Sequence, residues 1–88
     1  RAQAAGAAAD ERVFDALTRE LAALGDEVRN AIAGHGGAVD GFAVEYYAID
    51  REYSRLVRDT AAAAALLIRV RDLRSRLYDF IHRFPTPG

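Results

Sequence analysis

The stretch RDTAAAAALLIRV, residues 58–70, runs five alanines directly into two leucines and an isoleucine. Alanine, leucine and arginine are among the strongest helix formers, so this stretch predicts the interior of a helix. Its alanines add little bulk, but they allow another helix to come close. The rest of the sequence must show what that other helix is, and whether it belongs to the same chain or to a second copy.

The helical pattern extends well beyond this stretch. Over residues 42–84, thirteen positions alternate at spacings of four and three, and all but Thr60 and Arg74 are apolar or tyrosine. About six heptads of this kind are typical of a coiled-coil-like helix. We therefore predict one continuous second helix over this range, about 65 Å long at 1.5 Å per residue. A helix break near residues 59–62, capped by Asp59, is the alternative.

A shorter periodic segment comes before it. Apolar residues at spacings of three and four share one helical face: Phe14, Leu17, Leu21, Leu24, Val28 and Ala31. They predict a first helix over about residues 10–33, which Ala2–Ala9 could lengthen. The four glycines of AGHGGAVDGF predict a turn over residues 34–41. Within it we expect Gly34 to be the left-handed cap of the first helix and Asp40 the N-cap of the second.

These elements predict an all-α fold in a single helical domain, residues 1–88, with a C-terminal tail at residues 85–88. The domain is an antiparallel helical hairpin in which Phe14 faces the neighbourhood of Ala61 and the end of the second helix extends past the first. Such an uncovered apolar surface usually marks an interface. Burying four of its large side chains contributes about 6–10 kcal/mol before entropy is deducted. We therefore predict a homo-oligomer, with a dimer favoured, as a four-helix bundle or coiled-coil-like assembly.

The predicted interface lies on the apolar face of the second helix, within residues 61–84. Its residues are Leu66, Leu67, Val70, Leu73, Arg74, Leu77, Tyr78, Phe80, Ile81 and Phe84. Arg74 stands alone among apolar neighbours. It either pairs with an acid of the partner and fixes the register, or extends its charged end to solvent. A different helical protein is the alternative partner. The predicted function is a non-enzymatic protein–protein interaction or assembly module.

Composition argues against several functional classes. The chain has no cysteine, so it forms no disulfide and no thiolate metal site. Its net charge is −1, with four arginines against seven acids in residues 1–40 and eight against six in residues 41–88. A nucleic-acid-binding domain is usually strongly basic. Four arginines share one heptad position, which we interpret as a solvated outer face, with nucleic-acid binding as an alternative: Arg55, Arg69, Arg76 and Arg83.

The sequence also bears on location. No apolar run is long enough to span a membrane, and no signal peptide is visible at the N-terminus. A cytoplasmic location is therefore favoured, and secretion without a signal peptide is the alternative.

Candidate catalytic and metal-binding residues are few. Asp79 and His82 lie one helical turn apart and resemble part of a carboxylate–histidine metal site, but the further inward carboxylates of such a site are missing. We interpret them as a polar pair on a solvated face, with a metal-binding bundle as an alternative. Ser54 and Ser75 have no suitable base, and the GHGG segment lacks the context of a phosphate-binding loop. We predict no enzyme activity and no cofactor.

The layout resembles the small tryptophan-x-glycine helical hairpins exported by type VII secretion. The likeness rests on the length, the glycine-containing turn and the long second helix. Gly36, Ala38 and Phe42 stand at the family's offsets, and Ile49 follows one heptad later. The resemblance implies a secreted hairpin that works as a heterodimer. Gly34 takes the place of the family's tryptophan, and the family's Tyr-x-x-x-acid export signal is not in place after the second helix.

Overall fold

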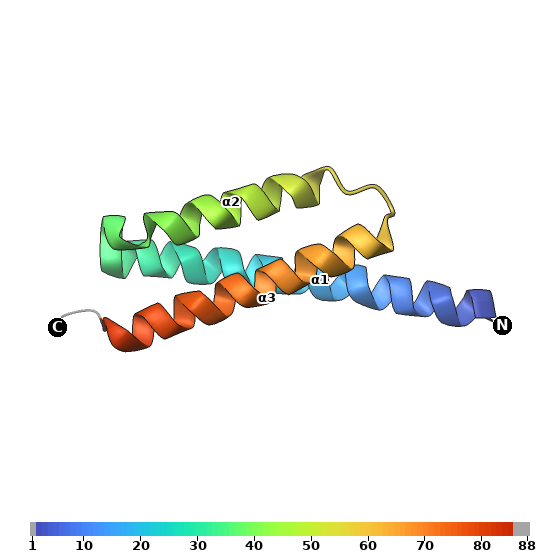
Figure 1. Cartoon of the computed structure of the whole chain (residues 1–88), viewed down its shortest axis with the longest axis horizontal. Coiled ribbons are helices and arrows are strands. Elements are labelled where there is room, and N and C mark those ends of the chain that lie inside the picture. Colours follow the sequence, from blue (N-terminus) through green and yellow to red (C-terminus); the bar gives the residue numbers. More distant parts are fainter. Residues whose placement is uncertain (1, 86–88) are drawn as a thin grey trace.

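The computed structural model describes residues 2–85, which form three α-helices and one short 3₁₀ helix (Figure 1). The elements are α1 (Ala2–His35), η1 (Gly36–Val39), α2 (Asp40–Ser54) and α3 (Thr60–Arg83). They build an elongated molecule with principal extents of 56 × 22 × 15 Å. The predicted all-α fold is confirmed. Of the predicted C-terminal tail, only Pro85 lies within the described residues.

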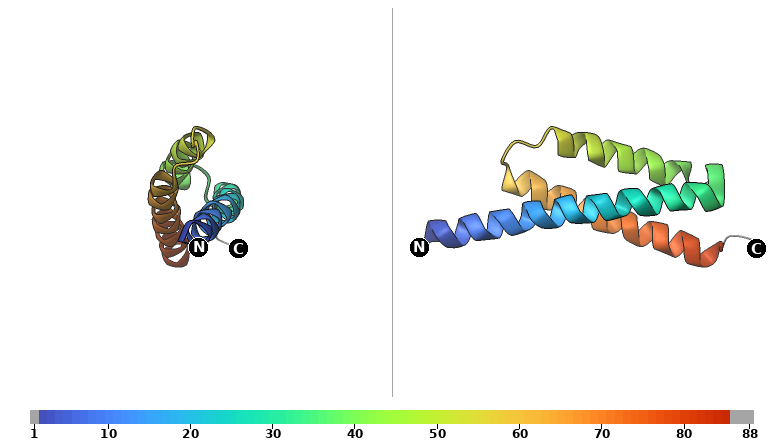
Figure 2. Two further views of the ribbon diagram at one scale, coloured as in Figure 1. Left: turned by 90° about the vertical axis from the view of Figure 1, so that its right-hand side faces the viewer. Right: turned by 180° about the vertical axis from the view of Figure 1, so that it is seen from behind.

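The chain runs up, down and up again. Thr18 of α1 and Tyr53 of α2 share a hydrogen bond between hydroxyls 2.7 Å apart, which places the middle of α1 beside the end of α2. The two helices are therefore antiparallel, as predicted for the hairpin. α3 then returns alongside α1 in the same direction. Seen end-on, α2 and α3 lie next to each other and α1 packs to one side of them (Figure 2).

The predicted continuous second helix is wrong: the helix breaks at residues 55–59. The side chain of Asp59 accepts a hydrogen bond from the backbone N–H of Ala62 at 3.1 Å, so Asp59 is the N-cap of α3, as in the alternative prediction. No glycine or proline forces this break. It follows from burial, because turning back lets α3 cover α1. Each large apolar side chain that α3 buries contributes about 1.5–3 kcal/mol, whereas each lost helical hydrogen bond costs about 0.5–1.5 kcal/mol.

The first turn also differs from its prediction. α1 continues to His35, and the left-handed residue that follows is Gly36, with φ = 60°, so Gly36 and not Gly34 ends the helix. Asp40 is not an N-cap. It is the first residue of α2, with helical φ and ψ, and the N-cap position belongs to Val39 without a side-chain hydrogen bond. The Asp40 carboxylate lies instead in the first turn of α2, where its negative charge interacts favourably with the positive end of the helix dipole.

The core is a single apolar cluster shared by all three helices. α1 supplies its predicted leucines and Val28, α2 supplies Ala43 and Ile49, and α3 supplies six residues: Ala63, Leu66, Leu67, Val70, Leu73 and Leu77. Of the alanines that open α3, Ala63 is fully buried inside the chain, whereas Ala61 and Ala65 are exposed. Over residues 2–85, no helix is both long and apolar enough to cross a membrane.

Candidate interaction surface

Half of the predicted interface is core within the chain. Five of its ten residues expose less than a tenth of their surface: Leu66, Leu67, Val70, Leu73 and Leu77. The prediction of an uncovered face is wrong for these five, because it assumed a straight second helix extending past α1. Once the chain turns back at residues 55–59, α1 covers this stripe.

The other five predicted residues lie toward the C-terminal end of α3 and remain partly or largely exposed. Phe84 is 58% exposed and Tyr78 is 40% exposed, while Arg74, Phe80 and Ile81 are half-buried. Beside them, at the end of α1, lies His35. A shallow groove runs between the two helix ends, with Ala31 and Gly34 on one side and Tyr78 and Ile81 on the other. We call the group His35, Tyr78, Ile81 and Phe84 the terminal surface.

Aromatic rings support the terminal surface from beneath. The Phe80 ring contacts three others: His35 at 5.4 Å in an edge-to-face arrangement, Phe42 at 5.6 Å and Phe84 at 5.0 Å between centroids. Edge-to-face and tilted pairs of this kind each add about 0.5–1.5 kcal/mol. Phe80 therefore joins the ends of α1, α2 and α3, and it holds the exposed Phe84 in a defined position.

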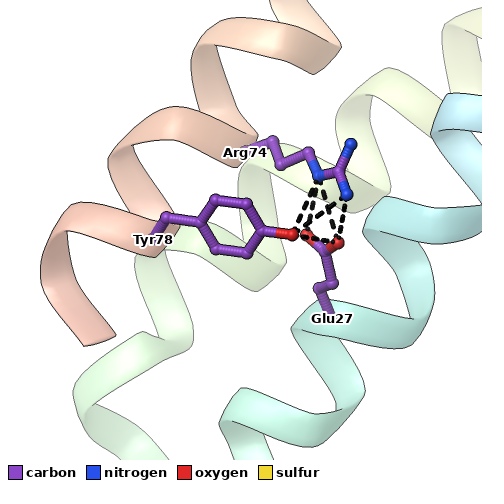
Figure 3. Close-up of polar contacts among 3 residues, drawn as sticks. All are labelled: Glu27, Arg74 and Tyr78. Carbon is purple, nitrogen blue, oxygen red and sulfur yellow. Dashed lines mark hydrogen bonds and ion pairs between the residues drawn. The ribbon is translucent and has the colours of Figure 1, made fainter. Parts of the chain in front are cut away.

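A polar cluster borders the groove (Figure 3). The Tyr78 hydroxyl donates to Glu27 Oε1 at 2.6 Å, and Arg74 Nε donates to both Glu27 oxygens at 3.0 and 3.1 Å. Arg74 also donates to the Tyr78 hydroxyl, at 3.0 Å from Nη2. The Glu27 carboxylate raises the pKa of Arg74, and the hydrogen bond to Tyr78 adds to this rise. The acid that pairs with Arg74 thus lies in the same chain, whereas the prediction placed it on a partner or left the charge in solvent.

The other arginines of α3 are also engaged by acids of the chain. Arg71 donates to both carboxylate oxygens of Glu20 on α1, at 2.9 and 2.8 Å. On the opposite flank, Arg76 donates to both oxygens of Glu45 on α2, at 2.9 and 2.6 Å, and Arg69 pairs with Glu52. Arg69 and Arg76 were predicted to line a solvated outer face, and they connect α3 to α2 instead.

These ion pairs lower the pKa values of the acids on α1 and α2. The hydrogen bond from Arg71 lowers the pKa of Glu20 below its ordinary value, and the one from Arg76 does the same for the pKa of Glu45. Both acids are therefore charged at neutral pH. Arg69, Arg71 and Arg76 are thus each paired with an acid of the same chain.

The two candidate metal residues, Asp79 and His82, each contact a different group on α3. Asp79 pairs with Arg83 at 3.5 Å, and the ring of His82 lies 2.7 Å from the backbone oxygen of Tyr78. Within residues 2–85, no three histidines and acids are grouped so that they could hold a metal ion. Asp79 and His82 therefore make local contacts on α3.

Two residues of this region were missed by the sequence reasoning. His35 was predicted to lie in the glycine turn, but α1 continues to it and its ring contacts Phe80. Glu27 lay outside the apolar pattern of the first helix. The isolated charge of Arg74 in the second heptad stripe was a signal for it, because a half-buried guanidinium usually has an acidic partner.

Comparison with known proteins leaves the fold and this surface as the basis for function: no family model matches the chain, and neither a curated protein nor a solved structure matches it. The chain is a small helical protein with exposed apolar residues.

Proposed function

We propose that this protein is a non-enzymatic interaction module that binds a helix of another chain through the terminal surface, in the simplest case a second copy of itself. The observation that carries the proposal is the exposure of Phe84, a large aromatic residue 58% open to solvent. Its ring packs on Phe80, which in turn contacts His35 of the groove. Large apolar side chains gathered at one place on a surface commonly mark a binding site.

The shape of the groove supports a helical partner. One wall carries the small residues Ala31 and Gly34, and the other carries the larger Tyr78 and Ile81. A helix can approach closely over small residues while its own apolar side chains contact the larger ones. Aromatic residues held rigid by their neighbours lose little side-chain entropy on binding, which favours them as anchors.

Other exposed apolar residues are less suitable. Val44 and Tyr47 lie on α2, Val57 lies in the α2–α3 connection, and Ile68 lies on α3 away from its buried face. They are spread over three parts of the chain. Ile68, at 67% exposure, is the natural control for Phe84, because it is also a large exposed apolar residue and lies on α3, which Phe84 directly follows.

The test is light scattering over a concentration series for the native chain, Phe84→Ser and Ile68→Ser. We expect the native chain and Ile68→Ser to dimerise with equal affinity and Phe84→Ser to dimerise at least about tenfold more weakly, the effect of losing about 1.4 kcal/mol. Circular dichroism is the control that checks whether both variants keep their helices.

Two outcomes would change the conclusion. If Phe84→Ser dimerises like the native chain, the terminal surface is not where copies meet. If the native chain stays monomeric at all concentrations, the partner is a different protein, as the resemblance to type VII hairpins implies. A helical partner would then have to lose affinity for Phe84→Ser but not for Ile68→Ser.

A further inference from the structure

The connection between α2 and α3 combines a bend with a sequence suited to a helix. Residues 55–59 read RLVRD and contain neither glycine nor proline. Arginine and leucine are strong helix formers, so nothing in this segment prevents it from continuing α2. Val57 in this segment is 81% exposed, more than the other exposed large apolar residues of the described chain. Apart from Asp59, which caps α3, the segment contains no residue typical of turns, and an exposed valine is unusual for a segment that serves only as a loop.

The apolar stripe keeps its phase across the bend. The heptad positions run through Tyr53, Leu56, Thr60 and Ala63 without insertion or deletion. The core-facing residues of α2 and α3 therefore lie on one common stripe if residues 55–59 become helical. A loop that only reverses the chain has no need to preserve this phase.

We propose that the α2–α3 connection is a hinge through which two copies exchange α3. In the exchanged dimer, residues 55–59 become helical and α2 and α3 join into one helix over about residues 40–83. The α3 of each copy then packs on the α1 and α2 of the other.

The exchange keeps the contacts that hold the closed chain. Arg71 with Glu20 and Arg74 with Glu27 reform between the copies, as do the buried leucine contacts of α3. The two hinge segments meet near the twofold axis, where the flanking Val57 side chains gain a partner. The hydrogen bond from Ala62 to Asp59 is lost, and helical hydrogen bonds through residues 55–59 replace it.

Thr60 offers a substitution that separates the two forms. It is the first residue of α3, a position where proline is well tolerated. Asp59 before it is extended, with φ = −104° and ψ = 98°, which is the conformation that a residue preceding proline prefers. In a continuous helix, proline at 60 would remove one hydrogen bond and clash with the carbonyl of Leu56. Thr60→Pro is thus compatible with the closed chain and destabilises the exchanged dimer, in which residue 60 lies inside a continuous helix.

The first experiment compares dimerisation of the native chain, Thr60→Pro and the matched control Thr60→Ala by light scattering. We expect Thr60→Ala to dimerise like the native chain. Thr60→Pro is expected to keep its helices and melting temperature, while the dissociation constant of the exchanged dimer, identified by its long distance between α2 and α3, rises by about 100-fold or more. Asp59→Ala, which removes the cap and favours the continuous helix, is expected to shift the balance toward the dimer.

The second experiment measures the distance between α2 and α3 within one chain of the dimer. Glu45→Cys and Arg76→Cys carry spin labels, which the absence of native cysteine makes specific, and labelled chain is diluted with unlabelled chain. These side chains touch in the closed form. Along one continuous helix they lie 31 residues apart, about 46 Å. We expect the long distance in the dimer and the short one in the Thr60→Pro background.

Three results would overturn the exchange: no dimer of the native chain, a dimer with only the short distance, or a Thr60→Pro dimer that shows the long distance at native affinity. The exchange does not use the terminal surface, so it predicts that Phe84→Ser leaves the long-distance dimer unchanged. A dimer of closed chains that depends on Phe84 would support the proposed function and reject the exchange. A Phe84-independent dimer with the long distance would support the exchange and reject the terminal surface as the self-association site.

Discussion

α3 meets its two neighbours in different ways. Against α1 it packs parallel, and its bidentate contacts to Glu20 and Glu27 flank a stripe of buried leucines. Its exposed arginines reach α2 through ion pairs whose side chains are about half exposed. α2 itself adds only Ala43 and Ile49 to the buried core. The α1–α3 side therefore depends on apolar burial, and the α2–α3 side depends more on solvated charge.

This difference indicates that α1 and α3 hold each other more firmly than α3 holds α2. Apolar burial is insensitive to salt, whereas exposed ion pairs contribute about 0–1 kcal/mol and weaken as salt rises. α2 is also the shortest of the three helices, at 15 residues, and isolated helices of this length are marginal in water. We expect α2 to open before α1 and α3 separate.

The largest effect should come from the α1–α3 side. Leu73 is fully buried, and Leu73→Ala is expected to lower the free energy of unfolding by about 2–5 kcal/mol through lost burial and the cavity left behind. Urea denaturation measures this. Ile68→Ala on the exposed side of the same helix should change stability by less than about 0.5 kcal/mol. Equal losses at the two positions would show that α3 does not pack on α1 as described.

The close approach of α1 and α2 gives the second test. A Cβ atom at Gly25 would lie 2.5 Å from Tyr46 Oη, so Gly25→Ala must displace the tyrosine at a cost of about 1–3 kcal/mol. In a Tyr46→Phe background the nearest clash is gone, and the higher helix propensity of alanine should stabilise α1 by up to about 1 kcal/mol. A double-mutant cycle by thermal or urea unfolding checks this. Additive effects would mean that α2 does not hold Tyr46 over Gly25.

The ion pairs on the two sides of α3 provide the third test. Arg74→Leu leaves the Glu27 carboxylate, about one-fifth exposed, without its cation, and should cost about 1 kcal/mol. Arg69→Leu breaks a half-exposed pair with Glu52 and should cost less than about 0.5 kcal/mol. Chemical denaturation at low and at high salt distinguishes them. A larger loss for Arg69→Leu would reverse the contrast between the two sides.

The smallest effect is on pH dependence. Glu20 and Glu45 have pKa values lowered in the folded chain, so unfolding raises them toward the ordinary value of 4.5. Their stabilisation is fully present above that pH and is lost as pH falls through the lowered values of the folded state. We expect Glu20→Gln and Glu45→Gln to reduce the acid-induced fall in melting temperature between about pH 5 and pH 3. An unchanged pH profile in both variants would contradict the two ion pairs.

The candidate surface could be predicted from the sequence only in part. Ile81 and Phe84 were identified because the heptad stripe continues to residue 84, and Tyr78 was identified because it lies beside this stripe. Leucines of the same stripe were assigned to an interface, although α1 covers them. A heptad pattern records that a face is apolar, but it does not record which helix covers that face. His35 and Glu27 joined the region only when α1 and α3 came together.

The sequence by itself determined the all-α class, the position of the first turn to within a few residues and the apolar face of every helix, because helical periodicity is local. Tertiary structure decided that the second apolar segment bends at residues 55–59, where local propensity favours a continuous helix. The reason is energetic: five residues outside a helix cost a few hydrogen bonds, whereas folding α3 onto α1 removes a whole leucine stripe from water. It also decided that Arg74 meets Glu27 within the chain.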